Sequence, residues 1–184
     1  MVISFSGPQS SGKSTLLKMC KDHFNDRFSY VDEVTRYVKR EYNVPINEDG
    51  NNITQLLIMN QHLHNSLKLT KNVIMDRCCI DGFLYTEWLN RKEKVSDWVF
   101  DYARNICKQL HSKLDIIFFC VADFPLVDDG ERSSNAEFRR EISTSFAAFF
   151  DTNKITPVIL SGSVENRFKT IIDTIDNRSR LPYA

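Results

Sequence analysis

Nine residues near the start of the chain have the types and spacing of a phosphate-binding loop (P-loop): Gly7-Pro8-Gln9-Ser10-Ser11-Gly12-Lys13-Ser14-Thr15. In this G-x-x-x-x-G-K-S pattern the glycines let backbone N–H groups turn inward, which makes a concave anion site at the start of a helix. The lysine of such a loop reaches the β- and γ-phosphates of a nucleotide, and the serine hydroxyl binds Mg²⁺. We therefore predict that these residues bind ATP, with Lys13 acting in phosphoryl transfer and Ser14 at the metal.

Acidic residues follow two other apolar runs. Asp76 comes directly after Val73-Ile74-Met75, and Asp32 and Glu33 come after a run that ends at Val31. Ligands gather at the carboxyl ends of parallel strands, so these acids are expected near the P-loop. Asp76 could hold Mg²⁺ directly or through water, or it could cap the next helix. Either Asp32 or Glu33 could accept a hydroxyl proton from an acceptor, although Glu33 could simply favour a helix N-terminus.

A polar segment later in the chain carries several arginines. Arg132 lies in Asp128-Asp129-Gly130-Glu131-Arg132-Ser133-Ser134, and Arg139 and Arg140 follow shortly after it. Guanidinium groups stabilise the charge that spreads over the transferred phosphoryl group. We predict a lid at about residues 127–140 that closes over the nucleotide and excludes water, with Arg132 at the phosphates. The alternative is a surface turn that leads into a charged helix.

Two further segments contain weaker candidates for site residues. Arg36 and Tyr37 lie on the segment that follows Glu33 and could contact an acceptor, although a solvated arginine is the ordinary case. Gly162 lies in a Ser-Gly-Ser loop after an apolar run, where the missing side chain would let the backbone approach an adenine closely. Any turn could use the same residues.

Short apolar runs alternate with amphipathic stretches along the whole chain. This alternation predicts an α/β fold in which buried parallel strands are joined by crossover helices. The predicted strands are 2–5, 28–31, 73–75, 116–121 and 155–160, and the predicted helices are 14–24, 33–41, 53–69, 81–90, 96–110, 135–150 and 164–177.

Length and composition narrow the class of protein. A chain of 184 residues suits one domain, which we predict to span residues 1–184. The 24 basic and 24 acidic residues cancel, so contact with a polyanion would need a local basic patch. The five cysteines have no metal-ligand spacing and are predicted to be buried free thiols. Without a signal-peptide pattern or an apolar run long enough to span a bilayer, we expect a soluble, cytoplasmic protein with no membrane partner.

Over nearly its whole length the chain resembles the P-loop nucleoside and nucleotide kinases, and more narrowly the group that contains the nicotinamide riboside kinase domain. The resemblance rests on the order and spacing of four motifs: residues 7–15, Asp32-Glu33-Val34-Thr35-Arg36, Asp76-Arg77-Cys78-Cys79-Ile80-Asp81, and Asp129-Gly130-Glu131-Arg132-Ser133 followed by Phe138-Arg139-Arg140-Glu141. It implies a five-stranded parallel sheet of order 2-3-1-4-5, ATP and Mg²⁺ as cofactors, and an acceptor bound between the second and third strands.

On this template Glu33 is the acceptor-side carboxylate, Asp76 the metal-side acid and Arg132 the lid arginine. The acceptor side is also expected to involve other residues of the motifs: Asp32, Arg36, Tyr37, Arg77, Asp81, Arg139 and Arg140. The chain departs from many nucleoside kinases at Arg77-Cys78-Cys79, where small polar residues would be expected after the acid. The acceptor's identity therefore does not carry over, and the role of the two cysteines stays open.

Three functions remain open at this point. The first is a kinase that phosphorylates a free nucleoside or nucleotide. The second is a kinase that acts on a 5-hydroxymethyl-pyrimidine within DNA, as related virus-encoded enzymes do, with a basic track formed by Lys68, Lys71, Arg91, Lys92 and Lys94. Those cations could equally form an ordinary solvated face. The third is a non-catalytic nucleotide-dependent switch, although a lid arginine argues against it.

Overall fold

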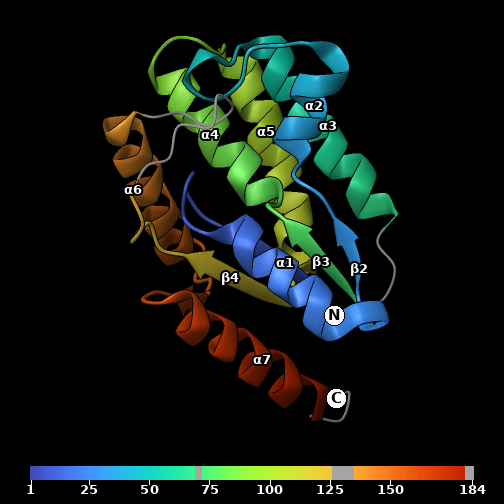
Figure 1. The fold of residues 1–184 in the computed structure, drawn as a ribbon. Coiled ribbons are helices and arrows are strands. Elements are labelled where there is room, and N and C mark those ends of the chain that lie inside the picture. The colour runs from blue at the N-terminus through green and yellow to red at the C-terminus, as the bar shows by residue number, and fades with distance from the viewer. Residues whose placement is uncertain (69–71, 126–134, 181–184) are drawn as a thin grey trace.

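The computed structural model describes residues 1–68, 72–125 and 135–180 (Figure 1). Its parallel strands form one sheet of order β2-β3-β1-β4-β5, as the resemblance implied. The strands are β1 (Val2–Ser6), β2 (Ser29–Val31), β3 (Val73–Asp76), β4 (Ile116–Cys120) and β5 (Val158–Leu160). The predicted fold class is confirmed.

Helices cover both faces of this sheet (Figure 1). One face packs against α1 and α7, and the other packs against α4, α5 and α6 with α3 behind them, while α2 packs on α3. The α-helices are α1 (Lys13–Phe24), α2 (Val34–Tyr42), α3 (Asn52–Leu67), α4 (Cys79–Arg91), α5 (Asp97–Leu110), α6 (Ala136–Thr152) and α7 (Val164–Arg180). Three short 3-10 helices lie at Asn25–Arg27, Asn47–Asp49 and His111–Lys113.

Strand β1 lies in the middle of the sheet, and its register places the site. Phe5 pairs with Asp76 on β3 and with Phe118 on β4, so the carboxyl ends of these strands meet at one edge. Alternating side chains point to opposite faces of a strand. Ile74 accordingly packs toward α1 and α7, whereas Met75 packs toward α4.

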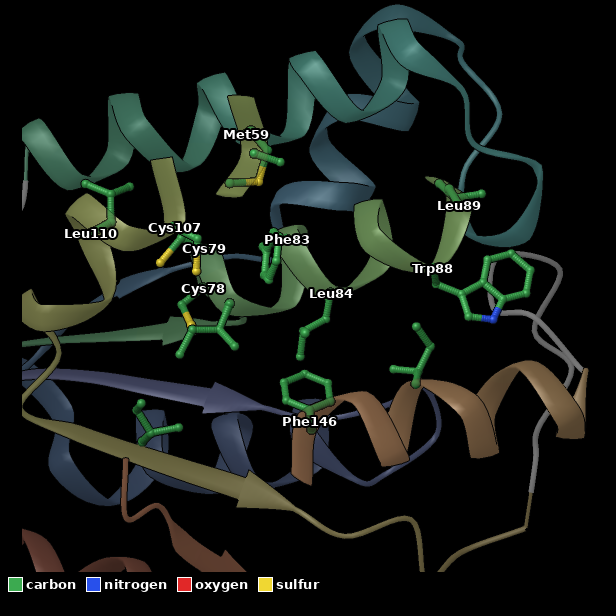
Figure 2. Packing of buried hydrophobic residues seen from close by; sticks show 14 of the residues in the cluster. Met59, Cys78, Cys79, Phe83, Leu84, Trp88, Leu89, Cys107, Leu110 and Phe146 are labelled. Atoms are coloured by element: carbon green, nitrogen blue, oxygen red, sulfur yellow. The ribbon is translucent and has the colours of Figure 1, made fainter. Parts of the chain in front are cut away.

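The larger part of the core lies under α4. Figure 2 shows Phe83 and Leu84 of α4 lying between α3, which carries Met59, and α6, which carries Phe146. All four side chains are buried, with Met59 and Phe146 fully so. Because this dense packing fixes α4, it also fixes the N-terminal turn of α4, which follows β3 directly at the sheet edge.

Several helix ends differ from the sequence prediction by a few residues, and two of these differences have a clear cause. Helix α4 begins at Cys79 rather than Asp81, because Asp81 is the N3 residue of a capping box and accepts a hydrogen bond from the backbone N–H of Cys78 at 3.2 Å. Helix α7 continues to Arg180 instead of ending near residue 177. Its last turn is held by Arg27, which binds Asp176 at 2.9 Å and Ser179 at 2.6 Å, a long-range contact that local periodicity cannot reveal.

Within the described ranges, none of the helices combines the length and apolar character needed to cross a bilayer.

Candidate active site

The P-loop joins β1 to α1 and needs both of its glycines. Gly7 has a φ of 137°, and a Cβ atom there would lie 2.6 Å from the backbone oxygen of Cys120. Gly12 has a φ of 84°, and a Cβ atom would lie 3.0 Å from the ring of Phe124. The first distance is shorter than real side chains allow, and the second would require the Phe124 ring to shift. Because both φ values also favour glycine, the close approach of the loop to Cys120 and Phe124 depends on these two residues.

Lys13 lies inside the loop and is buried. Its Nζ donates to the backbone oxygens of Gly7 at 2.9 Å and Pro8 at 2.7 Å, and to Ser11 Oγ at 3.0 Å. Burial, together with the positive charge of Arg77, lowers the pKa of Lys13 to about 8. A poorly solvated ammonium group surrounded by neutral oxygens is well placed to attract an anionic ligand.

Ser14 and Asp76 line one groove of about 230 Å³ beside α1. Asp76 Oδ1 is buried and has no hydrogen-bond partner. Burial, and next the negative charge of Glu33, raise the pKa of Asp76 to about 6. A partnerless carboxylate oxygen near a hydroxyl group suits Mg²⁺, which binds few protein oxygens and takes its other ligands from water and phosphate. The described residues contain no cluster of three or more histidine, cysteine or acidic residues able to hold a metal ion.

Glu33 lies between two arginines at the N-terminus of α2. Arg77 Nε donates to Glu33 Oε1 at 2.9 Å, and Arg36 Nε lies 3.0 Å from Glu33 Oε2. Burial alone would raise the pKa of this carboxyl, but the charges of Arg77, Lys13 and Arg36 hold it below its usual range. Glu33 is therefore ionised at neutral pH and fixed in orientation.

Arg77 connects the acceptor side to the P-loop. Besides Glu33, its Nη1 donates to the backbone oxygen of Gly7 at 3.0 Å and to Asp81 Oδ1 at 3.1 Å. Asp81 also accepts a hydrogen bond from the backbone N–H of Gly7 at 3.2 Å. Tyr85 lies one turn further along α4, with Arg77 5.4 Å from its ring centre and its hydroxyl 3.1 Å from Gln9 Oε1. The network makes Arg77 and Asp81 structural parts of the loop as well as candidates for binding.

Most of the predicted site residues therefore meet at one place. A single hollow is lined by P-loop residues 9–15 together with Glu33, Arg36 and Arg77. A second hollow continues from Glu33 and Arg77 toward α3 and is lined in addition by Asp81, Tyr85, Gln55 and His62. We regard the first as the nucleotide side and the second as the acceptor side.

Other predicted residues lie elsewhere. Asp32 is exposed, lines the groove that contains Ser14 and Asp76, and is paired with Lys21 at 3.2 Å, whereas its neighbour Glu33 lines both hollows. Tyr37 and Arg140 are exposed on their helices. Gly162 donates its N–H to Asp123 Oδ2 at 2.9 Å, and a Cβ atom there would meet nothing within 4 Å. Arg132 lies outside the described residues, as does most of the predicted lid.

Arg139 does not point to either hollow. It is buried at the start of α6, where its Nη2 donates to the backbone oxygens of Ser10 at 3.3 Å and Phe124 at 2.7 Å. The residues that sequence reasoning missed are Gln55 and His62 on α3 and Arg167 on α7. The α3 pair lies in a stretch whose apolar spacing predicted only a packing face, so no local signal distinguished them.

Among the described cations considered for a DNA track, Lys68 lies far from Lys94. At the start of α3, Asn52 donates a hydrogen bond to Ser96 Oγ and accepts one from the backbone N–H of Ser96, which follows Lys94 closely in the chain. Lys68 lies at the other end of the helix. A 16-residue helix separates these ends by about 24 Å. Arg91, Lys92 and Lys94 are each paired with an acidic side chain, and Lys71 lies outside the described residues.

Comparisons with known proteins place this geometry in context. A family model described as an AAA domain matches residues 2–167. A NadR protein in complex with NR shares 15% sequence identity with a TM-score of 0.72, over 100% of this chain and 52% of that one. The deoxyadenosine kinase from M. mycoides, with products bound, shares 14% identity with a TM-score of 0.72, over 97% of this chain and 100% of that one. The chain thus spans about half the length of the NadR chain.

At these identities the structural matches show a shared fold, the one that the kinase resemblance implied. A search of curated protein sequences found no match.

Proposed function

This chain belongs to the AAA domain family, and from that premise we propose that it is an ATP- and Mg²⁺-dependent kinase that phosphorylates a nucleoside or nucleotide. One observation carries the proposal: the ionised Glu33, held by two arginines, lies in the same hollow as the P-loop and Lys13. A carboxylate beside a phosphate-binding loop can orient a hydroxyl for attack on a terminal phosphate.

The residues of this chain divide the chemistry between them. The inward N–H groups of the P-loop and Lys13 would hold the triphosphate, and Glu33 would accept a hydrogen bond from the acceptor hydroxyl and finally its proton. Because the transition state of phosphoryl transfer is loose, a base of low pKa is sufficient when it orients the hydroxyl well. Ser14 and Asp76 would hold Mg²⁺, which would neutralise charge on the phosphate oxygens.

The ion pairs favour a hydroxyl acceptor over a phosphate acceptor. A phosphate monoester is usually bound by guanidinium groups that are free to form two parallel hydrogen bonds with it. Here Arg36 and Arg77 are both engaged by Glu33, and the acceptor hollow is otherwise lined by polar side chains such as Gln55, His62 and Tyr85. These groups suit the base and sugar of a neutral nucleoside.

Incubation with ATP, Mg²⁺ and separate acceptors tests this function. We expect phosphate transfer to at least one free nucleoside and little transfer to nucleoside monophosphates. A 5-hydroxymethyl-pyrimidine oligonucleotide and its unmodified counterpart form the DNA arm. Phosphate transfer to the modified oligonucleotide, but not to the unmodified one or to free nucleosides, would instead support a kinase that acts on a base within DNA. ATP-induced change in structure, without transfer to any acceptor, would point to the switch.

Asp76 gives a prediction in which stability and activity change in opposite directions. The pKa of the Asp76 carboxyl is about 6 in the folded protein, above its value in the unfolded chain. As pH rises from the unfolded pKa to the folded pKa, the unfolded chain ionises more readily, so the folded protein loses stability over this interval. Asp76→Asn removes this cost, and we expect the metal-free variant to be about 1–2 kcal/mol more stable at pH 7 and nearly unchanged at pH 4. Chemical denaturation at both pH values measures this, while Mg²⁺-dependent transfer should fall at least tenfold.

The reverse outcome would be informative. An Asp76→Asn variant that is less stable at pH 7 and equally active would remove Asp76 from the metal site.

A further inference from the structure

Two buried arginines hold the outer side of the P-loop. Arg139 of α6 donates to the backbone oxygen of Ser10 at 3.3 Å, and Arg167 of α7 donates to the backbone oxygen of Ser11 at 3.0 Å. Arg139 is 8% exposed and Arg167 is 1% exposed, so both guanidinium groups are removed from bulk water. Neither Arg139 nor Arg167 lines the nucleotide hollow or the acceptor hollow described above.

The geometry of the peptide bond links these contacts to phosphate binding. In a trans peptide the C=O and the following N–H point in opposite directions. Arg139, bound to the carbonyl of Ser10, therefore directs the N–H of Ser11 away from itself, and Arg167, bound to the carbonyl of Ser11, does the same for the N–H of Gly12. Both N–H groups then face the concave side of the loop. Neither N–H donates to any atom of the described residues, so both are available to an anion.

Both arginines are anchored on the segment that follows β4. Arg167 Nη2 binds Asp123 Oδ2 at 2.8 Å, its guanidinium lies 4.5 Å from the ring centre of Phe124, and its Nε donates to the backbone oxygen of Gly162 at 3.0 Å. Arg139 binds the backbone oxygen of Phe124. Side chains held by this many partners have little freedom, so they fix the carbonyls that they bind.

The charges behind the loop are not balanced. Asp123 pairs with Arg167, whereas Arg139 forms no ion pair with any described residue. Asp123 acts on Arg139 only at longer range, so these three described side chains carry one net positive charge on the outer side of the anion site.

We propose that Arg139 and Arg167 are positioning residues for the donor nucleotide, which keep two P-loop peptide planes oriented with their N–H groups toward the phosphates. The inference rests on the proposed function, because it requires a phosphate-bearing ligand in the loop.

Calorimetric binding of ATP and of inorganic tripolyphosphate tests the inference in Arg139→Met and Arg167→Met. Each variant is expected to bind both ligands at least tenfold more weakly, while the KM of the nucleoside acceptor stays within twofold. Arg27→Met is the matched control: it removes one positive charge and a contact to α7, at Asp176 and Ser179, far from the loop. It should bind both ligands as the unaltered protein does, and thermal unfolding checks that every variant is folded.

Several results would overturn the inference. Unchanged ATP affinity in the folded variants would do so, as would loss of ATP binding with tripolyphosphate binding intact, because that pattern means an effect on the nucleobase. A parallel rise in the KM of the acceptor would show a merely structural role. If Arg167→Met does not fold, Arg139→Met decides alone. If the unaltered protein binds neither ligand, the proposed function fails together with the inference.

Discussion

Replacing Lys13 with methionine is expected to lower kcat/KM for ATP by at least about 10³-fold, the scale on which single electrostatic groups act in phosphoryl transfer. Methionine preserves much of the apolar stem but removes the buried ammonium group that Gly7, Pro8 and Ser11 hold inside the loop. Steady-state transfer assays measure the loss, and circular dichroism checks the fold. Near-native activity in the folded variant would remove Lys13 from the catalytic machinery.

The pKa of Lys13 adds a pH signature to the same experiment. In the protein without ligand the pKa is about 8, and a bound polyphosphate would raise it. Above pH 8 the side chain must take up a proton when ATP binds, so the Kd of ATP should rise with pH, by up to tenfold per unit. Lys13→Met should lack this rise, so a slope that persists in the variant would assign the titration to another group.

Replacing Glu33 with glutamine is expected to lower kcat by about 10²–10⁴-fold, the range typical for loss of a general base. Glutamine keeps the shape of the side chain but cannot take up the acceptor's proton. It also removes the carboxylate that Arg36 and Arg77 share, although Arg77 keeps its ion pair with Asp81. The Kd of ATP should change little. Single-turnover transfer at saturating ATP isolates this effect from binding.

Asp32→Asn is the matched control for Glu33→Gln. Asp32 is adjacent in sequence, carries the same charge and has a side chain that is 91% exposed, and among the described residues it pairs with Lys21 on the surface. We expect its substitution to change kcat less than threefold, because exposed ion pairs contribute little. A larger loss in Asp32→Asn than in Glu33→Gln would make Asp32 the base.

Local patterns were sufficient to predict the sheet and much of the site. The P-loop is recognisable because its chemistry depends on the order of a few residues, and Asp32, Glu33 and Asp76 were predicted to lie near it because parallel strands end at one edge. The preference for Glu33 over Asp32 came from the family resemblance. The order of the five strands came from the family resemblance rather than from the pattern. Helix ends shifted where long-range contacts intervened, as Arg27 does at the end of α7.

Residues that act across the fold could not be found in this way. Arg167 looks like one of several charged residues on an amphipathic helix, yet it is buried because Asp123, Gly162 and Ser11 all offer it oxygen atoms. Gln55 and His62 reach the acceptor hollow only because Gly82 lets α3 and α4 approach closely, since a Cβ atom there would lie 2.8 Å from Met59 and 3.1 Å from His62. Such contacts depend on the tertiary structure.

The hydrogen bond from Arg77 to the backbone oxygen of Gly7 affects how the acceptor preference of this protein could evolve or be redesigned. Any change at Arg77 that admits a new acceptor would also disturb the loop that we propose binds the donor nucleotide, so selection at this position would trade one affinity against the other. Thr35, Gln55 and His62 line the acceptor hollow without a hydrogen bond to the loop among the described residues. Libraries aimed at altered selectivity should therefore diversify those three positions and keep Arg77 unchanged.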